Sequence, residues 1–207
     1  MTLVLASTSP RRYHILSLLN LPFLMVSPGV PEVALTGRSP EQETLSHAQS
    51  KAASLAAQFP EAILIGSDTL ISLDGAGIGK PKDVDDARDI LRRLRGRVHK
   101  VVTAVAMVQG KRAVETVETA RVRMREFSDQ ELEAYLATGD SLDKAGAYSV
   151  QGLGRSLIER LDGDYLAVMG LPLRAVAVGL RELGCSVPAD VDRIYRERSV
   201  LNWRTFG

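Results

Sequence analysis

The sequence predicts an α/β protein with a mixed, twisted sheet and flanking helices, arranged as two lobes around a central cleft. Extended and helical patterns alternate along the chain, and helices stand between many of the strand candidates. The chain has 207 residues, of which 45% are hydrophobic and 25% are charged. This length is enough for one core or two small lobes. We expect one domain over residues 1–187 and a tail over 188–207.

The N-terminal part of the chain begins with a short apolar strand candidate over residues 2–5. Ser9 is a typical N-cap and Pro10 suits the first helical position, so a helix is expected to follow. Asp74-Gly75 is typical of a turn. The other elements expected here are a strand over 24–26, a loop over 28–40, a helix over 40–58 and a long strand over 62–73.

The C-terminal part continues the alternation. Asp83 is the expected N-cap of a helix over 84–95. Ser128 and Glu131 form a capping box for a helix that ends near Gly139. The remaining expected elements are extended segments over 98–108, 113–124, 157–161 and 165–168, and a last helix over 172–183.

Charge and cysteine content argue against several classes of protein. The formal net charge is +1, so no global field would attract nucleic acid or a membrane surface. Cys185 is the only cysteine, which favours a reducing compartment. No apolar run has membrane-spanning length, and the N-terminus lacks the pattern of a signal peptide. We therefore expect a cytoplasmic protein with neither a membrane nor a nucleic-acid partner.

The segment STSPRR, residues 7–12, combines hydroxyl groups, a helix start and two cations. The first turn of a helix offers unpaired N–H groups, and Ser7 adds a hydroxyl, so an anion can bind there. Arg11 and Arg12 add forked donors that suit phosphate, although the helix dipole disfavours cations at this end. A bound anion would explain them. A capped helix with two surface arginines is an equally weighted alternative.

Asp68 interrupts the apolar strand candidate over residues 62–73 within the segment GSDT. A buried carboxylate costs several kcal/mol unless it is paired or bound to a metal. Gly66 would let a ligand approach the backbone. The alternative is an aspartate at a strand end that faces solvent. We favour a functional carboxylate, because little polarity around it explains its presence otherwise.

Two lysines are weaker candidates when each is judged by itself. Lys80 lies in the constrained segment GKP and could meet a phosphate, but a surface lysine is the more common case. Lys51 lies at the edge of the apolar stripe of its helix, where most lysines extend to solvent. His47 precedes Lys51 by one turn. Like His14 and His99, it has no partner at metal-ligand spacing, so we assign it a structural role.

Gln151 ends the small-residue segment DKAGAYSVQ, which is followed by a glycine. Its amide presents a donor and an acceptor together, which suits the recognition of a base edge. A tight connection between two elements is the alternative interpretation.

Seven segments of the chain occur in a recognisable order. They are ASTSPRR, SHAQSKA, GSDT, GKP, GRVHKVVTAV, TGDSLDKAGAYSVQG and GDYLAVMGLPL. Together they resemble the Maf family of nucleoside triphosphate pyrophosphatases, over about residues 3–182. Several motifs in a fixed order are far more specific than any one of them. The resemblance implies cleavage between the α- and β-phosphates, giving a monophosphate and pyrophosphate. It also implies a two-lobed α/β fold related to the inosine triphosphate pyrophosphatases.

The resemblance implies roles for individual residues in catalysis. Asp68 matches the family's proposed proton acceptor. A divalent cation, Mg²⁺ or Mn²⁺, is implied as cofactor. Asp68 either accepts the proton or holds this metal, and Glu32, in the loop after the strand expected over 24–26, is a candidate for a further ligand. Arg12, Lys51 and Lys80 are expected to stabilise charge on the phosphates and on the departing pyrophosphate.

The resemblance also implies which base is bound. Arg11, Thr69 and Gln151 match the family's specificity positions in the subfamily that acts on dTTP and UTP. Modified pyrimidine nucleotides are further candidate substrates. A second subfamily, which prefers 7-methyl-GTP, carries tryptophan where this chain has Arg11. Ser7 is expected to contact the substrate.

Other functions and the oligomeric state stay open at this point. A 7-methyl-GTP pyrophosphatase and a non-catalytic, nucleotide-binding regulator of cell division are the alternatives to a dTTP/UTP pyrophosphatase. A homodimer is the candidate assembly.

Overall fold

The computed structural model describes residues 2–31, 35, 37–198 and 203. These residues form one sheet with the strand order β2-β1-β3-β5-β6-β7, in which β4 pairs with β3 off this path. β1 is parallel to β2 and β3, whereas the pairs from β3 through β7 are antiparallel. The strands are β1 (Leu3–Ala6), β2 (Leu24–Val26), β3 (Ile63–Leu73), β4 (Ala76–Ile78), β5 (Val98–Gln109), β6 (Arg112–Met124) and β7 (Ile158–Asp162).

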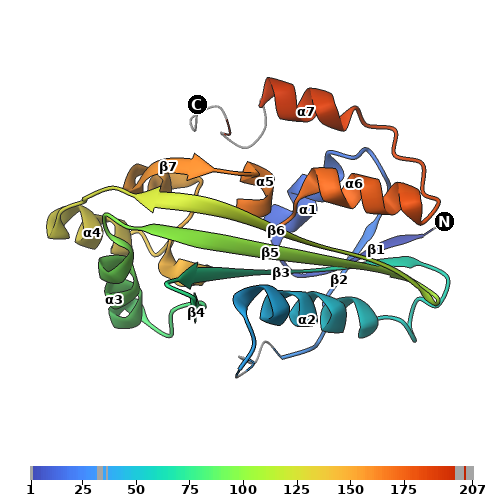
Figure 1. Ribbon diagram of the computed structural model, residues 1–207, viewed down its shortest axis with the longest axis horizontal. Helices are drawn as coiled ribbons and strands as arrows, with labels where there is room; N and C mark the ends of the chain where they lie inside the picture. Colours follow the sequence, from blue (N-terminus) through green and yellow to red (C-terminus); the bar gives the residue numbers. More distant parts are fainter. Residues whose placement is uncertain (1, 32–34, 36, 199–202, 204–207) are drawn as a thin grey trace.

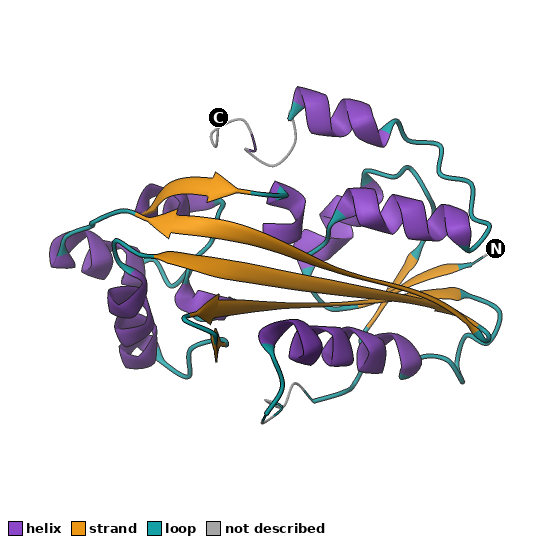
Figure 2. Ribbon diagram, viewed as in Figure 1, coloured by secondary structure: helices purple, strands orange, loops and turns teal. Residues whose placement is uncertain are grey.

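Helices flank the sheet in two groups at its two ends (Figures 1 and 2). α2 lies on one face, and α1 and α6 lie on the other, at the end that carries β1 and β2. α3 and α4 gather at the opposite end, and the long strands β3, β5 and β6 connect the two. The predicted mixed α/β fold is confirmed. The helices are α1 (Pro10–Ser17), α2 (Pro40–Ala53), α3 (Val84–Leu94), α4 (Asp129–Leu136), α5 (Tyr165–Val168), α6 (Leu173–Glu182) and α7 (Val191–Glu197), with two 3₁₀ turns, η1 (Ala145–Ala147) and η2 (Gly152–Leu157).

Local capping signals predicted several helix starts correctly. Ser9, Asp83 and Ser128 are N-caps whose side chains accept a backbone N–H from the first turn. The turn at Asp74-Gly75 is also present. Both residues have positive φ, as the tight turn between two antiparallel strands requires, and it connects β3 to the short β4. Among the described helices, none is long and apolar enough to cross a membrane.

Two element predictions are wrong. Residues 165–168 were expected to be extended but form α5, because Asp164 caps a helical turn by accepting from the Leu166 N–H at 2.8 Å. A short run of buried residues has no periodicity that separates helix from strand. The helix expected over 40–58 ends at Ala53, and isolated turns follow.

The pairing register brings the chain after β1 beside the polar segment of β3. Ala6 is the last residue of β1 and pairs with Gly66, while β3 continues to Leu73. The segment that begins at Ser7 therefore leaves the sheet next to Ser67 and Asp68. Crevices at the carboxyl ends of parallel strands are common ligand sites in α/β proteins.

Gly66 also brings α2 unusually close to β3. A Cβ atom on Gly66 would lie 2.1 Å from the carbonyl oxygen of Ala48 and 2.7 Å from the nitrogen of Ala52. These atoms belong to the backbone of α2 and cannot rotate away. Glycine on the strand and alanines on the helix thus set a short distance between the two elements.

The C-terminal segment, whose register the sequence did not determine, packs against α5. The Tyr195 hydroxyl in α7 donates to Oδ2 of Asp164 at 2.7 Å. Trp203 stacks on Tyr165, with ring centroids 5.5 Å apart, and meets Tyr195 edge-on. The chain beyond α6 therefore supports the short helix that precedes Gly170.

Candidate active site

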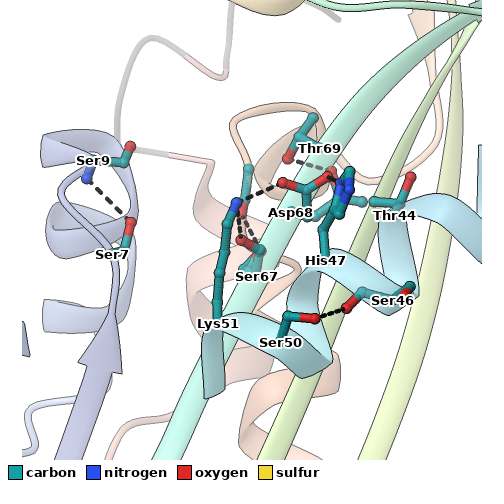
Figure 3. Close-up of polar contacts among 12 residues, drawn as sticks. Ser7, Ser9, Thr44, Ser46, His47, Ser50, Lys51, Ser67, Asp68 and Thr69 are labelled. Carbon is teal, nitrogen blue, oxygen red and sulfur yellow. Dashed lines mark hydrogen bonds and ion pairs between the residues drawn. The ribbon is translucent and has the colours of Figure 1, made fainter. Parts of the chain in front are cut away.

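Asp68 and Lys51 form a buried ion pair between β3 and α2 (Figure 3). Nζ of Lys51 lies 2.6 Å from Oδ1 of Asp68, and it also contacts the carbonyl oxygen of Ser67 at 3.5 Å. The pair compensates for much of the hydration that both charges lose, which explains a carboxylate within an apolar strand. Lys51 is only 4% exposed, so the alternative in which it extends to solvent is wrong.

His47, to which the sequence analysis assigned a structural role, belongs to the same cluster. Its Nδ1 atom lies 3.4 Å from Oδ2 of Asp68, and its side chain lines the cavity described below. The sequence contained one usable signal. His47 and Lys51 are four residues apart on one helix and therefore lie on the same face.

Arg12 is held by partners distant in sequence. Its Nε donates to the carbonyl oxygen of Gly170 at 2.9 Å, and its Nη2 donates to Oγ1 of Thr69 at 3.3 Å. Ser67 Oγ donates to the same Gly170 carbonyl at 2.9 Å. The loop after α5 therefore orients both the arginine and the strand that carries Asp68.

A hydrogen-bond chain continues from Arg12 into the sheet. Thr103 Oγ1 donates to the carbonyl oxygen of Ala167 at 2.8 Å, which uses its only proton. The 2.9 Å contact between Oγ1 of Thr69 and Oγ1 of Thr103 must then be donated by Thr69. Thr69 in turn accepts from Arg12. The direction of each bond follows from this count of protons, and the guanidinium is fixed relative to β3.

The start of α1 forms another wall of the site. Ser9 caps the helix, and its own N–H donates to Oγ of Ser7 at 3.1 Å. Ser7 is buried, whereas Arg11 is half-buried, and both line the cavity. The hydroxyls, the helix start and the two arginines therefore line one cavity. Binding of an anion there stays a prediction.

The cavity has a volume of about 1150 Å³ and lies between the two groups of elements. This volume exceeds that of most small-molecule pockets. Seven of the predicted site residues line it: Ser7, Arg11, Arg12, Lys51, Asp68, Thr69 and Lys80. It also receives side chains that the sequence analysis did not select, namely Glu43, His47, Lys82, Asp143, Lys144 and Tyr148.

A backbone hydrogen bond joins the loop that carries Lys80 to the small-residue segment DKAGAYSVQ, residues 143–151. The Gly146 N–H donates to the carbonyl oxygen of Gly79 at 3.0 Å. Gly146 has φ of 72°, and a Cβ there would lie 2.3 Å from Cδ1 of Ile71. Only glycine fits this position without strain. Lys80, which follows Gly79 directly, lines the cavity.

Two predicted residues are not among those that line the cavity. Gln151 follows the lining residues Ser149 and Val150, and its side chain is a hydrogen-bond partner of Tyr165. Glu32 lies outside the described residues. The structure therefore brings the catalytic candidates together, whereas a contact of Gln151 with a base stays a prediction.

A buried polar pair supports the far wall of the cavity. Nε2 of His99 lies 2.7 Å from the Tyr148 hydroxyl. Burial lowers the pKa of His99 to about 4 and raises the pKa of Tyr148. Both groups are therefore neutral near pH 7, and they hold the wall in place without adding charge to the site.

The donor set of the cavity fits a divalent cation that is shared with a bound polyphosphate. Within the part of the chain that the structure describes, no three His, Cys, Asp or Glu side chains are grouped as a complete metal site. Mg²⁺ is usually held by one or two carboxylates together with substrate phosphates. The carboxylate of Asp68, at the cavity wall, suits that mode of binding.

The chain is similar to one family model and to several known proteins. A family model described as Maf-like protein matches residues 2–183. A dTTP/UTP pyrophosphatase of Dictyoglomus turgidum is 43% identical over 188 residues, covering 89% of this chain and 97% of the relative. A dTTP/UTP pyrophosphatase of Aquifex aeolicus is 43% identical over 183 residues, covering 88% and 96%. A solved structure of a HAM1 protein from Coxiella burnetii has a TM-score of 0.50 and 13% identity, covers 88% of this chain and 99% of that chain, and supports the fold alone.

Proposed function

The chain belongs to the family of Maf-like proteins, and from this premise we propose that it hydrolyses dTTP and UTP to the nucleoside monophosphate and pyrophosphate. One observation of the structure carries the proposal. A large cavity gathers a buried carboxylate and several cationic side chains from distant parts of the chain. Such a site suits a polyanion that must be bound and then attacked by water.

Binding of the triphosphate is proposed to involve Arg12, Lys80 and the start of α1. Arg12 is already held by Gly170 and Thr69, so its charge needs no reorganisation when the transition state forms. The N–H groups of the first helical turn add donors for a phosphate. Cations from both sides of the cavity can then stabilise the charge of the departing pyrophosphate.

The chemical step is proposed as attack of a water molecule on the α-phosphorus. The water oxygen forms a bond to this phosphorus, and the bond from phosphorus to the oxygen that bridges to the β-phosphate breaks. Asp68 is proposed to accept the proton that the water loses. Lys51 stays paired with Asp68 and keeps the carboxylate in the cavity wall. Pyrophosphate leaves with the bridging oxygen.

A divalent cation, Mg²⁺ or Mn²⁺, is part of the proposal. When bound, it would neutralise phosphate charge and lower the pKa of coordinated water. Glu32 and phosphate oxygens are proposed to hold it, and the alternative role of Asp68, in place of accepting the proton, is that of a further ligand. Removal of divalent ions with EDTA should abolish turnover, and Mg²⁺ or Mn²⁺ should restore it.

The base is proposed to be selected by Arg11, Thr69 and Gln151. A guanidinium donates to the carbonyl oxygens of uracil and thymine. Methylated guanine carries positive charge and prefers an aromatic face, so Arg11 should repel it. A matched panel of dTTP, UTP, CTP, GTP and 7-methyl-GTP tests this choice, with monophosphate and pyrophosphate measured separately.

The expected result is the highest kcat/KM for dTTP and UTP, with one pyrophosphate released per monophosphate. Release of orthophosphate and a nucleoside diphosphate as the first products would overturn the proposed reaction. A higher kcat/KM for CTP or 7-methyl-GTP would overturn the base preference alone. Arg11→Trp should lower kcat/KM for dTTP.

A further inference from the structure

We infer that His47 is a positioning residue that fixes the orientation of the Asp68 carboxylate. The inference rests on the proposed function for its catalytic consequence, and on the geometry of α2 and β3 for its physical basis. His47 and Lys51 approach Asp68 from successive turns of one helix (Figure 3). Each is paired with a different oxygen of the carboxylate.

The two contacts together restrict the carboxylate more than one could. Lys51 Nζ lies 2.6 Å from Oδ1, and His47 Nδ1 lies 3.4 Å from Oδ2. An ionised carboxylate oxygen only accepts hydrogen bonds, so the inference requires the form of His47 that carries a proton on Nδ1. The terminal torsion of an aspartate is broad when only one oxygen is held. Donors on both oxygens define the plane of the group.

The donors themselves are placed by backbone contact. Ala48 and Ala52 lie against Gly66, and each directly follows one of the two donor residues. Gly66 precedes Asp68 by two residues on the same strand. The close approach of α2 to β3 therefore determines how far His47 and Lys51 lie from the carboxylate. It also leaves α2 little freedom to move toward the strand.

His47 is not required to compensate for the charge of Asp68. Lys51 already lies within ion-pair distance and is buried with it. The His47 side chain is 15% exposed and lines the cavity, as does Asp68. A side chain in this place acts on the geometry of the reacting carboxylate. Its loss should therefore lower kcat and leave KM nearly unchanged, because the cations proposed to bind the triphosphate belong to other elements than α2.

Two variants separate the hydrogen-bond donor from the bulk of the ring. In His47→Asn, the amide nitrogen is bonded to Cγ, as Nδ1 is in histidine, so a donor is kept in nearly the same position. His47→Leu keeps most of the volume of the side chain but has no donor. We expect His47→Leu to lower kcat for dTTP about tenfold, since small misplacements of reacting groups have effects of this size or larger. His47→Asn should retain at least about a third of wild-type kcat, with KM within about twofold in both.

His14→Leu is the matched control, because His14 is exposed on α1 and does not line the cavity. Its kcat should equal that of the wild type. Equal kcat values for His47→Leu and His47→Asn, whether reduced or normal, would overturn the inference. So would a loss that appears only in KM.

A second measurement does not depend on turnover. In ¹H–¹⁵N spectra of the imidazole rings, Asp68→Asn should shift the Nδ1 resonance of His47 and leave that of His14 in place. An unchanged His47 resonance would contradict the contact. If the wild type cleaves no nucleoside triphosphate, the proposed function fails, and the spectrum still decides whether His47 contacts Asp68, on which the inference depends.

Discussion

Lys51 and Asp68 stand 17 positions apart in the chain, yet Nζ of the lysine meets Oδ1 of the aspartate at 2.6 Å inside the protein. The contact joins α2 to β3 beside the point where β1 ends. Breaking one side of a buried ion pair is more damaging than replacing both, because a charge is left without compensation. A substitution that removes the charge of Asp68 but keeps its volume can therefore test the role of this pair in activity while the protein stays folded.

Replacing Asp68 with asparagine should leave the protein folded and almost inactive. The amide keeps the volume of the side chain and an acceptor for Lys51, but it loses both basicity and negative charge. We expect kcat for dTTP to fall at least about 100-fold, the scale of a lost general base. The free energy of unfolding should fall by about 1–3 kcal/mol, because Lys51 loses a charged partner. Turnover near the wild-type rate would refute the assigned role.

Replacing Gly66 with alanine should separate α2 from β3. The new Cβ would lie 2.1 Å from the backbone oxygen of Ala48, so the helix must move. We expect a loss of about 1–3 kcal/mol in the free energy of unfolding, as for other overpacked cores. Gly79→Ala is the control, because nothing lies within 4 Å of its Cβ position. Urea unfolding measures both variants, and equal stabilities would contradict the close contact.

The stability of the protein should fall below pH 6.5 because of His99. Burial lowers its pKa from 6.5 to about 4 in the folded state. Between these values the unfolded chain binds more protons than the folded one, so acid favours unfolding. Above pH 6.5, neutral His99 makes its full contribution to the free energy of unfolding. At pH 5 the free energy of unfolding is lower by about 2 kcal/mol, given about 1.4 kcal/mol per pKa unit.

Urea unfolding at pH 7 and pH 5 checks the role of His99. The wild type should lose about 2 kcal/mol more between these pH values than His99→Gln does, because glutamine has no proton to gain. Other titrating groups act on both proteins and cancel in the comparison. The same loss in both proteins would exclude His99 as the cause.

Replacing Tyr195 with phenylalanine should loosen the C-terminal segment from α5. The hydroxyl donates to Asp164 at 2.7 Å and accepts from the Arg174 N–H at 3.2 Å. Burial raises the pKa of Asp164, which makes the lost donor costly. We expect a loss of about 1–3 kcal/mol in the free energy of unfolding. Tyr13→Phe, at an exposed tyrosine, should change stability little and serves as the comparison.

Local signals in the sequence predicted most of the secondary structure. Capping side chains such as Ser9 and Ser128 act within one helical turn, so their effect can be identified from neighbouring residues alone. The same approach failed for α5, because residues 165–168 are buried whichever conformation they adopt. It also failed at the end of α2, where no glycine marks the stop.

The sequence by itself determined the α/β fold class and most of the elements, the hydroxyl-rich start of α1, the anomalous carboxylate of Asp68 and the family of the chain. Those features depend on residue type and on spacing within short segments. Only the tertiary structure decided that His47 meets Asp68, that Gly170 holds Arg12 from 158 positions away, and that the C-terminal segment packs on α5. These contacts depend on strand register and on the distance between helix and sheet. Strand register and the distance between helix and sheet result from many weak packing contacts across the whole core. Those contacts join segments that are distant in the sequence, so they cannot be identified from any short segment alone.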